Sequence, residues 1–158
     1  MTILDGKKTS NDIKDEIAHE VNSIISNGDR PPHLAAVIVG NDGASLTYVG
    51  SKVRACEKVG FDSTLVSLDD SISEKELLDK VYELNNDKKI DGYIVQLPLP
   101  EHIDTQKVLL AVDPKKDVDG FHPVNFGRMA LNLPTFISAT PNGICLLYTS
   151  PSPRDGTK

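Results

Sequence analysis

The sequence of 158 residues has little cysteine, no run of basic residues and no long apolar stretch. Its two cysteines, Cys56 and Cys145, lie far apart, so the sequence indicates no disulfide framework and no metal site of the zinc-finger kind. No apolar run approaches the roughly 18 residues that a membrane helix needs. The first ten residues show neither a signal-peptide pattern nor an Arg-rich transit peptide. We therefore expect a cytoplasmic protein without membrane contact.

The charge balance is acidic, with 23 Asp and Glu against 17 Lys and Arg and a formal net charge of −6. A general nucleic-acid surface is not expected from such a chain. Charged residues make up 25% and hydrophobic residues 39% of the sequence, which is ordinary for a globular protein. The length is sufficient for one compact domain with its own core.

Three segments have apolar residues at helical spacing or clear helix-start signals. The stretch 9–29 carries Ile13, Ile17 and Val21 on one face, and Thr9 followed by Asp12 resembles a capping box. The run that contains Tyr48 and Lys52 predicts a helix that ends at Gly60. The stretch 73–87 opens with a second capping box, and a shorter helix is expected over 104–112.

Three apolar runs between these helices predict strands, over 34–40, 61–68 and 90–100. Pro98 and Pro100 should stop the third strand. Alternating helices and strands predict an α/β fold, in which a parallel sheet is covered by helices on both faces. Ligands of such sheets bind beyond the carboxyl ends of the strands.

Several polar side chains fall at that expected crevice. Tyr48 and Lys52 are four residues apart, so they share one face of their helix, and Gln96 ends the third strand. Partial burial would lower the pKa of Lys52, and a neutral amide could bind this amine without favouring its charge. Asp117 and Asp119, in the loop "DPKKDVDGFHP", could accept hydrogen bonds from ring N–H groups.

Each of these features also has an ordinary structural interpretation. A Tyr/Lys pair at this spacing is common by chance, and "DVDG" is typical of a turn. "QLPLP" can be a strand end followed by a rigid turn. Cys56 is expected to be a small buried residue on its helix. Together the polar groups indicate a pocket, but they identify no reaction.

Five stretches together resemble one enzyme family. They are "ILDGKKTS", "VGNDGASLTYVGSKVRACEKVGF", "LNNDKKIDGYIVQLPLPEHID", "DPKKDVDGFHPVNFGR" and "TPNGICLL". In this order and spacing, over about residues 3–147, the chain is similar to the bifunctional methylenetetrahydrofolate dehydrogenase/methenyltetrahydrofolate cyclohydrolases. "YVGSK", "DGYIVQLPLP" and "KDVDGFHP" are specific in combination.

The resemblance implies a homodimeric enzyme of one-carbon metabolism, which serves purine and amino-acid biosynthesis. Such enzymes oxidise 5,10-methylenetetrahydrofolate, usually with NADP, and hydrolyse the resulting methenyl cation to 10-formyltetrahydrofolate. It also implies that Lys52 is the catalytic lysine, that Gln96 tunes it and that Tyr48 stacks on the folate. Asp119 would hold the pterin ring. The remaining residues implied to line the folate pocket are Val49, Gly50, Ser51, Val95 and Leu97.

The sequence departs from the family after residue 147. The glycine-rich turn GRS-x-x-VG-x-P of the second, Rossmann domain and the later PGGVGPMT segment do not occur. We therefore expect residues 1–147 to form an incomplete folate-binding catalytic domain, inactive as a dehydrogenase. The stretch 148–158 matches nothing in the family, and its composition predicts a disordered tail. We interpret it as a sequence artefact, with a natural short isoform as the alternative.

Two other functions are compatible with parts of the pattern. Short-chain dehydrogenases also use Tyr-x-x-x-Lys, but they require a glycine-rich turn after their first strand, and "VGNDGAS" lacks it. The chain could instead be a non-catalytic module that binds folate or dimerises. The three shared motifs favour the folate enzyme family over the first alternative, whereas the missing cofactor segment keeps the second one open.

Overall fold

The computed structural model describes residues 5–147. Its elements follow one another as α1 (Gly6–Ser26), β1 (His33–Val39), α2 (Gly43–Val59), β2 (Asp62–Leu68), α3 (Glu74–Asn86), β3 (Gly92–Val95), α4 (Thr105–Ala111), α5 (Pro123–Ala130) and α6 (Ala139–Leu147). The expected order of helix and strand is confirmed up to α4. The disordered tail predicted over 148–158 lies outside the described residues.

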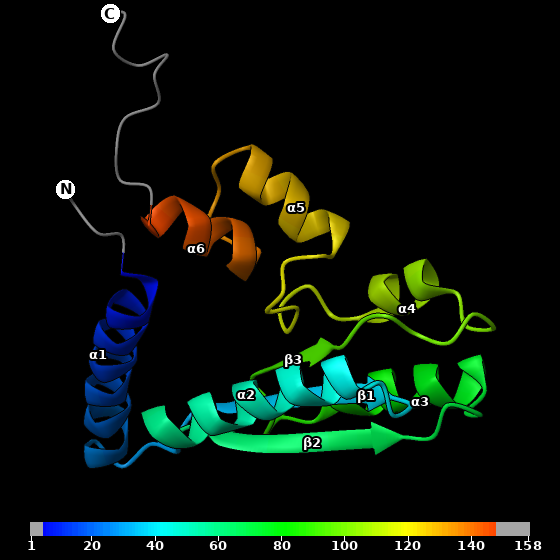
Figure 1. The fold of residues 1–158 in the computed structure, drawn as a ribbon, viewed down its shortest axis with the longest axis horizontal. Helices are drawn as coiled ribbons and strands as arrows, with labels where there is room; N and C mark the ends of the chain where they lie inside the picture. The colour runs from blue at the N-terminus through cyan, green and yellow to red at the C-terminus, as the bar shows by residue number, and fades with distance from the viewer. Residues whose placement is uncertain (1–4, 148–158) are drawn as a thin grey trace, which may run out of the picture.

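The three strands form a parallel sheet in the order β2-β1-β3 (Figure 1). Alternate residues of β1 point to opposite faces of the sheet. Ala35 and Val37 pack with α3 residues such as Leu77, whereas Ala36 and Ile38 pack with Val49 of α2. Both faces are therefore covered by helices, and the predicted three-layer α/β class is confirmed.

The start of α1 differs from the prediction. Thr9 and Asp12 do not form a capping box, because the side chain of Asp5 accepts the Lys8 N–H at 2.9 Å and caps the helix one turn earlier. Thr9 lies inside the helix and donates its hydroxyl to the Asp5 carbonyl. Asp12 instead pairs with Lys8 across one turn at 2.6 Å. The capping box of α3, formed by Ser73 and Glu76, is confirmed.

The third strand is shorter than predicted, and α5 was not predicted at all. β3 contains only Gly92–Val95, although the N–H of Gln96 still donates to the Val37 carbonyl at 2.8 Å. The following prolines, Pro98 and Pro100, have no N–H with which to extend the ladder. α5 begins with Pro123 at its first turn, which is a common helix start.

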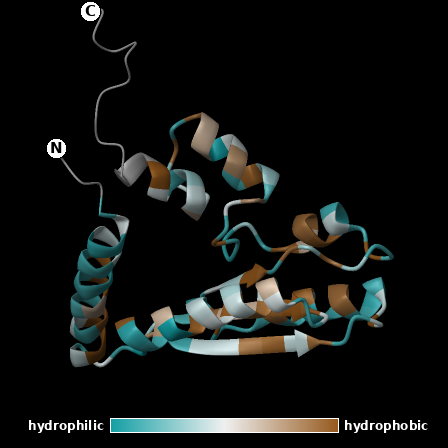
Figure 2. Ribbon diagram, in the orientation of Figure 1, coloured by the Kyte–Doolittle hydropathy of each residue, from teal (hydrophilic) through white to brown (hydrophobic). Residues whose placement is uncertain are grey.

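The outer edge of the sheet is open in the described part of the chain. β2 is the terminal strand, and most of its residues are exposed, including Leu65 at 49%. Figure 2 shows a hydrophobic stretch in the second half of this strand, followed by a pale arrowhead. None of the described helices is both long and apolar enough to cross a membrane.

Candidate active site

A cavity of about 300 Å³ lies between α2, the end of β3, the turn after Asp117 and the start of α6. Polar groups from separate segments converge on it, namely Tyr48, Lys52, Gln96 and Asp119. Val95 and Leu97 form part of its apolar wall. The carboxyl end of β3 therefore opens into a hollow with an amine, a carboxylate, an amide and an aromatic ring.

The helix α2 sets the position of Tyr48 and Lys52. It begins where Asp42 accepts the N–H of Ser45 at 2.8 Å, and it ends at Gly60, whose φ of 82° is favourable only for glycine. One helical turn separates the two side chains, and the Lys52 nitrogen lies 4.6 Å from the centre of the Tyr48 ring. The Tyr48 side chain remains 51% exposed, so ring surface is available to a ligand.

Lys52 and Asp119 perturb each other across the cavity. Burial lowers the pKa of the Lys52 amine, and the negative charge of Asp119 partly opposes that effect. Burial likewise raises the pKa of the Asp119 carboxyl, with the Lys52 charge opposing it and the Asp117 charge adding to it. Each group therefore changes its protonation closer to neutral pH than an exposed group of its kind.

Gln96 lies in the same cavity wall but is not bonded to Lys52 in this structure. Its Nε2 donates to the carbonyl of Leu97 at 2.7 Å. This bond uses one of its donors and leaves its acceptor oxygen available. The Gln96 oxygen can therefore accept a hydrogen bond from a neighbouring amine or from a ligand.

Two glycines bring the Asp119 turn close to the rest of the fold. A Cβ on Gly92 would lie 2.3 Å from Cγ1 of Val118, so the turn packs directly on the bare backbone of β3. Gly120 has a φ of 67°, and a Cβ there would lie 2.8 Å from the carbonyl of Phe136. Larger residues at these positions would displace the carboxylate of Asp119.

The structure brings six of the nine predicted site residues to this cavity and places three elsewhere. Val49 points into the core, where it is 1% exposed. Ser51 is exposed and donates its hydroxyl to the carbonyl of Tyr48 at 2.6 Å, and the nearest group to a Cβ on Gly50 would be the side chain of Arg54. These three residues shape α2 but do not line the cavity.

Asp117 does not offer a free carboxylate to a ligand, contrary to the interpretation of the sequence. It is 5% exposed and accepts hydrogen bonds from the N–H groups of Phe121 and His122 and from the side chain of Asn125. Its role is internal because these donors surround both of its oxygens.

Part of the cavity wall was not identified from the sequence. It consists of Phe121, Ser138, Ala139, Thr140 and Pro141. The stretch 138–141 reaches the site only through the tertiary fold, and no spacing in the sequence connects it to Lys52. The available signals were the family stretches "KDVDGFHP", which contains Phe121, and "TPNGICLL", which begins with Thr140 and Pro141.

A larger hollow of about 670 Å³ lies between α1, α2 and α6 and shares Lys52 with the first. Its walls are mostly apolar, with residues such as Ile13, Val59 and Phe61. The buried Cys56 lines it, as a small apolar residue of α2 should, and burial raises the pKa of its thiol. Chemistry is expected in the smaller cavity, where the polar groups converge.

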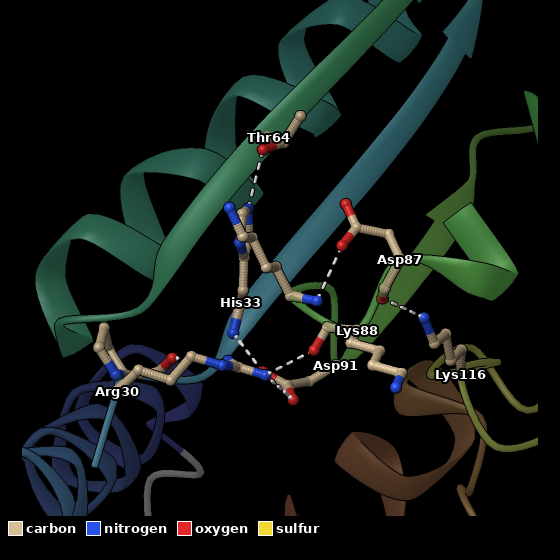
Figure 3. Close-up of polar contacts among 9 residues, drawn as sticks. Arg30, His33, Thr64, Asp87, Lys88, Asp91 and Lys116 are labelled. Atoms are coloured by element: carbon tan, nitrogen blue, oxygen red, sulfur yellow. Dashed lines mark hydrogen bonds and ion pairs between the residues drawn. The ribbon is translucent and has the colours of Figure 1, made fainter. Parts of the chain in front are cut away.

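Another polar cluster, at the amino ends of the strands, is structural (Figure 3). Arg30 pairs with the carboxylate of Asp91 through two hydrogen bonds of 2.6 and 2.8 Å, and Asp91 also accepts the N–H of His33. These bonds tie the segment before β1 to the start of β3. Residues 5–147 contain no group of three or more His, Cys, Asp or Glu arranged to hold a metal ion.

Comparison with known proteins gives a consistent result. Residues 4–119 match the family model described as tetrahydrofolate dehydrogenase/cyclohydrolase, catalytic domain. The bifunctional protein FolD of Flavobacterium johnsoniae is 71% identical over 144 residues, which cover 91% of this chain and 49% of that protein. The chain thus spans about half the length of the curated relatives that it matches.

Solved structures show the same likeness. The bifunctional FolD enzyme of Campylobacter jejuni is 42% identical, with a TM-score of 0.90 over 94% of this chain and 53% of that one. The dehydrogenase-cyclohydrolase of Trypanosoma brucei, solved with NADP cofactor and an inhibitor, is 30% identical. Its TM-score is 0.89, over 94% of this chain and 51% of its own.

Proposed function

The chain belongs to the tetrahydrofolate dehydrogenase/cyclohydrolase family, and on that premise we propose that the cavity around Lys52 binds a reduced folate. The observation that carries the proposal is the convergence of Lys52, Tyr48, Gln96 and Asp119 on one hollow. The reactions are oxidation of 5,10-methylenetetrahydrofolate to the methenyl cation and hydrolysis of that cation to 10-formyltetrahydrofolate.

Lys52 assists the hydrolytic step. The substrate carries a positive charge, so a charged ammonium beside it would be repulsive. Because burial lowers its pKa, Lys52 is more readily neutral than an exposed lysine and can take a proton from the attacking water. The free acceptor oxygen of Gln96 can orient the amine without stabilising its charge as strongly as a carboxylate would.

Tyr48 and Asp119 orient the folate. The half-exposed ring of Tyr48 offers a stacking surface for the flat pterin. The Asp119 carboxylate faces the same hollow and accepts no hydrogen bond from the described residues, so it can accept from ring N–H groups of the pterin. The two groups thus recognise a face and an edge of one planar ligand.

The hydride acceptor of the oxidation is NADP, as named for the Trypanosoma brucei relative. The N-termini of α2, α3 and α4 do not fit its pyrophosphate. Phosphates favour helix N-termini with free N–H groups, whereas α2 and α4 are capped by Asp42 and Asp104, and α3 has Glu74 and Glu76 in its first turn. Their negative charges would repel a phosphate, so no step here is assigned to the cofactor.

Two copies of the protein associate as a homodimer in the cytoplasm. The exposed edge of β2, with its hydrophobic second half, supports self-association because an open strand edge pairs readily with another chain. The free, buried thiol of Cys56 supports a reducing compartment. Leu65→Lys should therefore lower the oligomeric state measured by sedimentation.

Hydrolysis of 5,10-methenyltetrahydrofolate, followed by its absorbance, tests the proposed reaction on the full chain. The chain should accelerate hydrolysis over buffer, and Lys52→Met should reduce that acceleration by about 100-fold or more, because general-base catalysis contributes at least this much. Lys58→Met is the matched control, since Lys58 lies on the same helix but pairs with Asp15 at the surface.

Equal rates for the chain and Lys52→Met would contradict the catalytic role of Lys52. A chain that binds tetrahydrofolate but does not accelerate hydrolysis would instead be a non-catalytic folate-binding module.

A further inference from the structure

We propose that Asn125 is a positioning residue that holds Asp119 in place against Lys52 and the folate by fixing the carboxylate of Asp117. The inference rests on the proposed folate site. Asn125 does not line the cavity; it lies on α5, behind the turn that carries Asp119.

The side-chain amide of Asn125 is buried, and its hydrogen-bonding atoms all have partners. It is 4% exposed, and its Nδ2 donates to the carbonyl of Pro114 at 2.8 Å and to Oδ2 of Asp117 at 2.9 Å. Its Oδ1 accepts the hydroxyl of Thr135 at 2.8 Å. An amide with two donors and its acceptor all used holds one orientation, and losing it would leave buried polar groups unpaired.

The carboxylate of Asp117 links Asn125 to the turn that carries Asp119. It accepts the N–H of His122 at 2.8 Å and that of Phe121 at 3.3 Å. The backbone of Asp117 also forms a parallel bridge with Tyr93 of β3, and its carbonyl accepts the N–H of Gly120. The turn is therefore bonded on both sides of Asp119.

Asp119 depends on that backbone for its position. Its carboxylate accepts no hydrogen bond from the described residues, so only the turn determines where the charge lies. The segment 117–122 cannot move toward the sheet, because Val118 already fills the space over Gly92. Without Asn125, Asp117 would keep only its backbone donors, and the turn could shift away from Lys52.

A double-mutant cycle separates positioning from general stability. Asn125→Ala is made alone and together with Asp119→Asn, and the dissociation constant for tetrahydrofolate is measured for the full chain. Asn86→Ala is the control, because Asn86 is an exposed asparagine on α3 that only donates to the Tyr82 carbonyl.

Asn125→Ala should weaken tetrahydrofolate binding by about tenfold, as expected for a lost hydrogen bond to a charged group. In the Asp119→Asn background the same change should have an effect of less than about twofold, because the group it positions is already gone. An equal loss in both backgrounds would overturn the proposal and make Asn125 a purely structural residue.

The pKa of Lys52, followed by NMR of labelled lysine, is a second readout that needs no folate. The Asp119 charge raises the Lys52 pKa, so displacing Asp119 should lower it further in Asn125→Ala and not in Asn86→Ala. With Asp119→Asn present, Asn125→Ala should leave it unchanged. An unchanged pKa in the single variant would overturn the proposal.

The two readouts distinguish failure of the proposed function from failure of this inference. If the chain does not bind tetrahydrofolate, the proposed function fails, and the Lys52 titration alone decides whether Asn125 positions Asp119. If Asn125→Ala does not fold, Thr135→Val removes one bond of the network while keeping its shape. It should then change the Lys52 pKa in the same direction by a smaller amount, and no change would overturn the proposal.

Discussion

The amine of Lys52 lies 4.6 Å from the centre of the Tyr48 ring, one helical turn away in α2. Both side chains line the cavity that also contains Gln96 and Asp119. The ring favours a positive charge on the amine, whereas burial disfavours it. These effects oppose each other, so small changes around Lys52 will shift the equilibrium between its charged and neutral forms.

Tyr48 should act through its ring. Tyr48→Ala should weaken tetrahydrofolate binding about threefold to tenfold, because stacking of an aromatic ring contributes about 0.5–1.5 kcal/mol beyond burial. Tyr48→Phe should remain within about twofold of the unchanged chain. Isothermal titration of the two variants is the measurement. Equal losses for Ala and Phe would make the hydroxyl the working group, as in a short-chain dehydrogenase.

Lys52 should be more reactive than an exposed lysine at the same pH. The pKa of Lys52 in the folded chain is lowered from 10.5. As the pH increases, its amine therefore becomes neutral and nucleophilic at a lower pH than the amine of an exposed lysine. Reductive methylation across a pH series, followed by mass spectrometry, should label Lys52 with a midpoint below that of the exposed Lys75, because the hydrogen bond to Asp79 raises the pKa of Lys75. Asp119→Asn should lower the midpoint further, since Asp119 opposes the effect of burial. A Lys52 midpoint at or above that of Lys75 would show that burial does not lower the Lys52 pKa.

Gly92 should be intolerant of a side chain. A Cβ would lie 2.3 Å from Cγ1 of Val118, so Gly92→Ala should reduce the free energy of unfolding by about 1–3 kcal/mol through overpacking. Gly43→Ala is the control, since a Cβ there meets nothing within 4 Å. Denaturant unfolding measures both variants. Adding Val118→Ala to Gly92→Ala should restore part of the loss, and a lack of any restoration would place the strain elsewhere.

Local patterns predicted most of the fold. The apolar run of β1 and the capping box of α3 are signals carried by neighbouring residues, and the structure has both elements where they were expected. α5 was not predicted because it has only eight residues, contains Gly127 and begins at Pro123, which ends the stretch interpreted as a loop. The start of α1 was misplaced because Asp5 and Thr9 are both good caps, and only the folded chain shows which one is used.

The site was predictable only as far as its groups lie at a strand end or on the helix that follows a strand. Lys52 and Gln96 could be placed together by the rule for parallel sheets. The internal role of Asp117 could not be predicted from the sequence. It depends on a hydrogen bond from Asn125, and the Asn125 side chain is in turn held by a hydrogen bond from Thr135. Such networks are formed by tertiary contacts, which no short motif encodes.

Titration of tetrahydrofolate into the isotopically labelled chain tests the proposed location of the folate site most directly. The backbone amide signals of Lys52, Gln96 and Asp119 should shift together and saturate with one affinity. Signals along the apolar hollow, such as those of Ile13 and Phe61, should change far less. No saturable shift, or shifts confined to that larger hollow, would contradict the assignment.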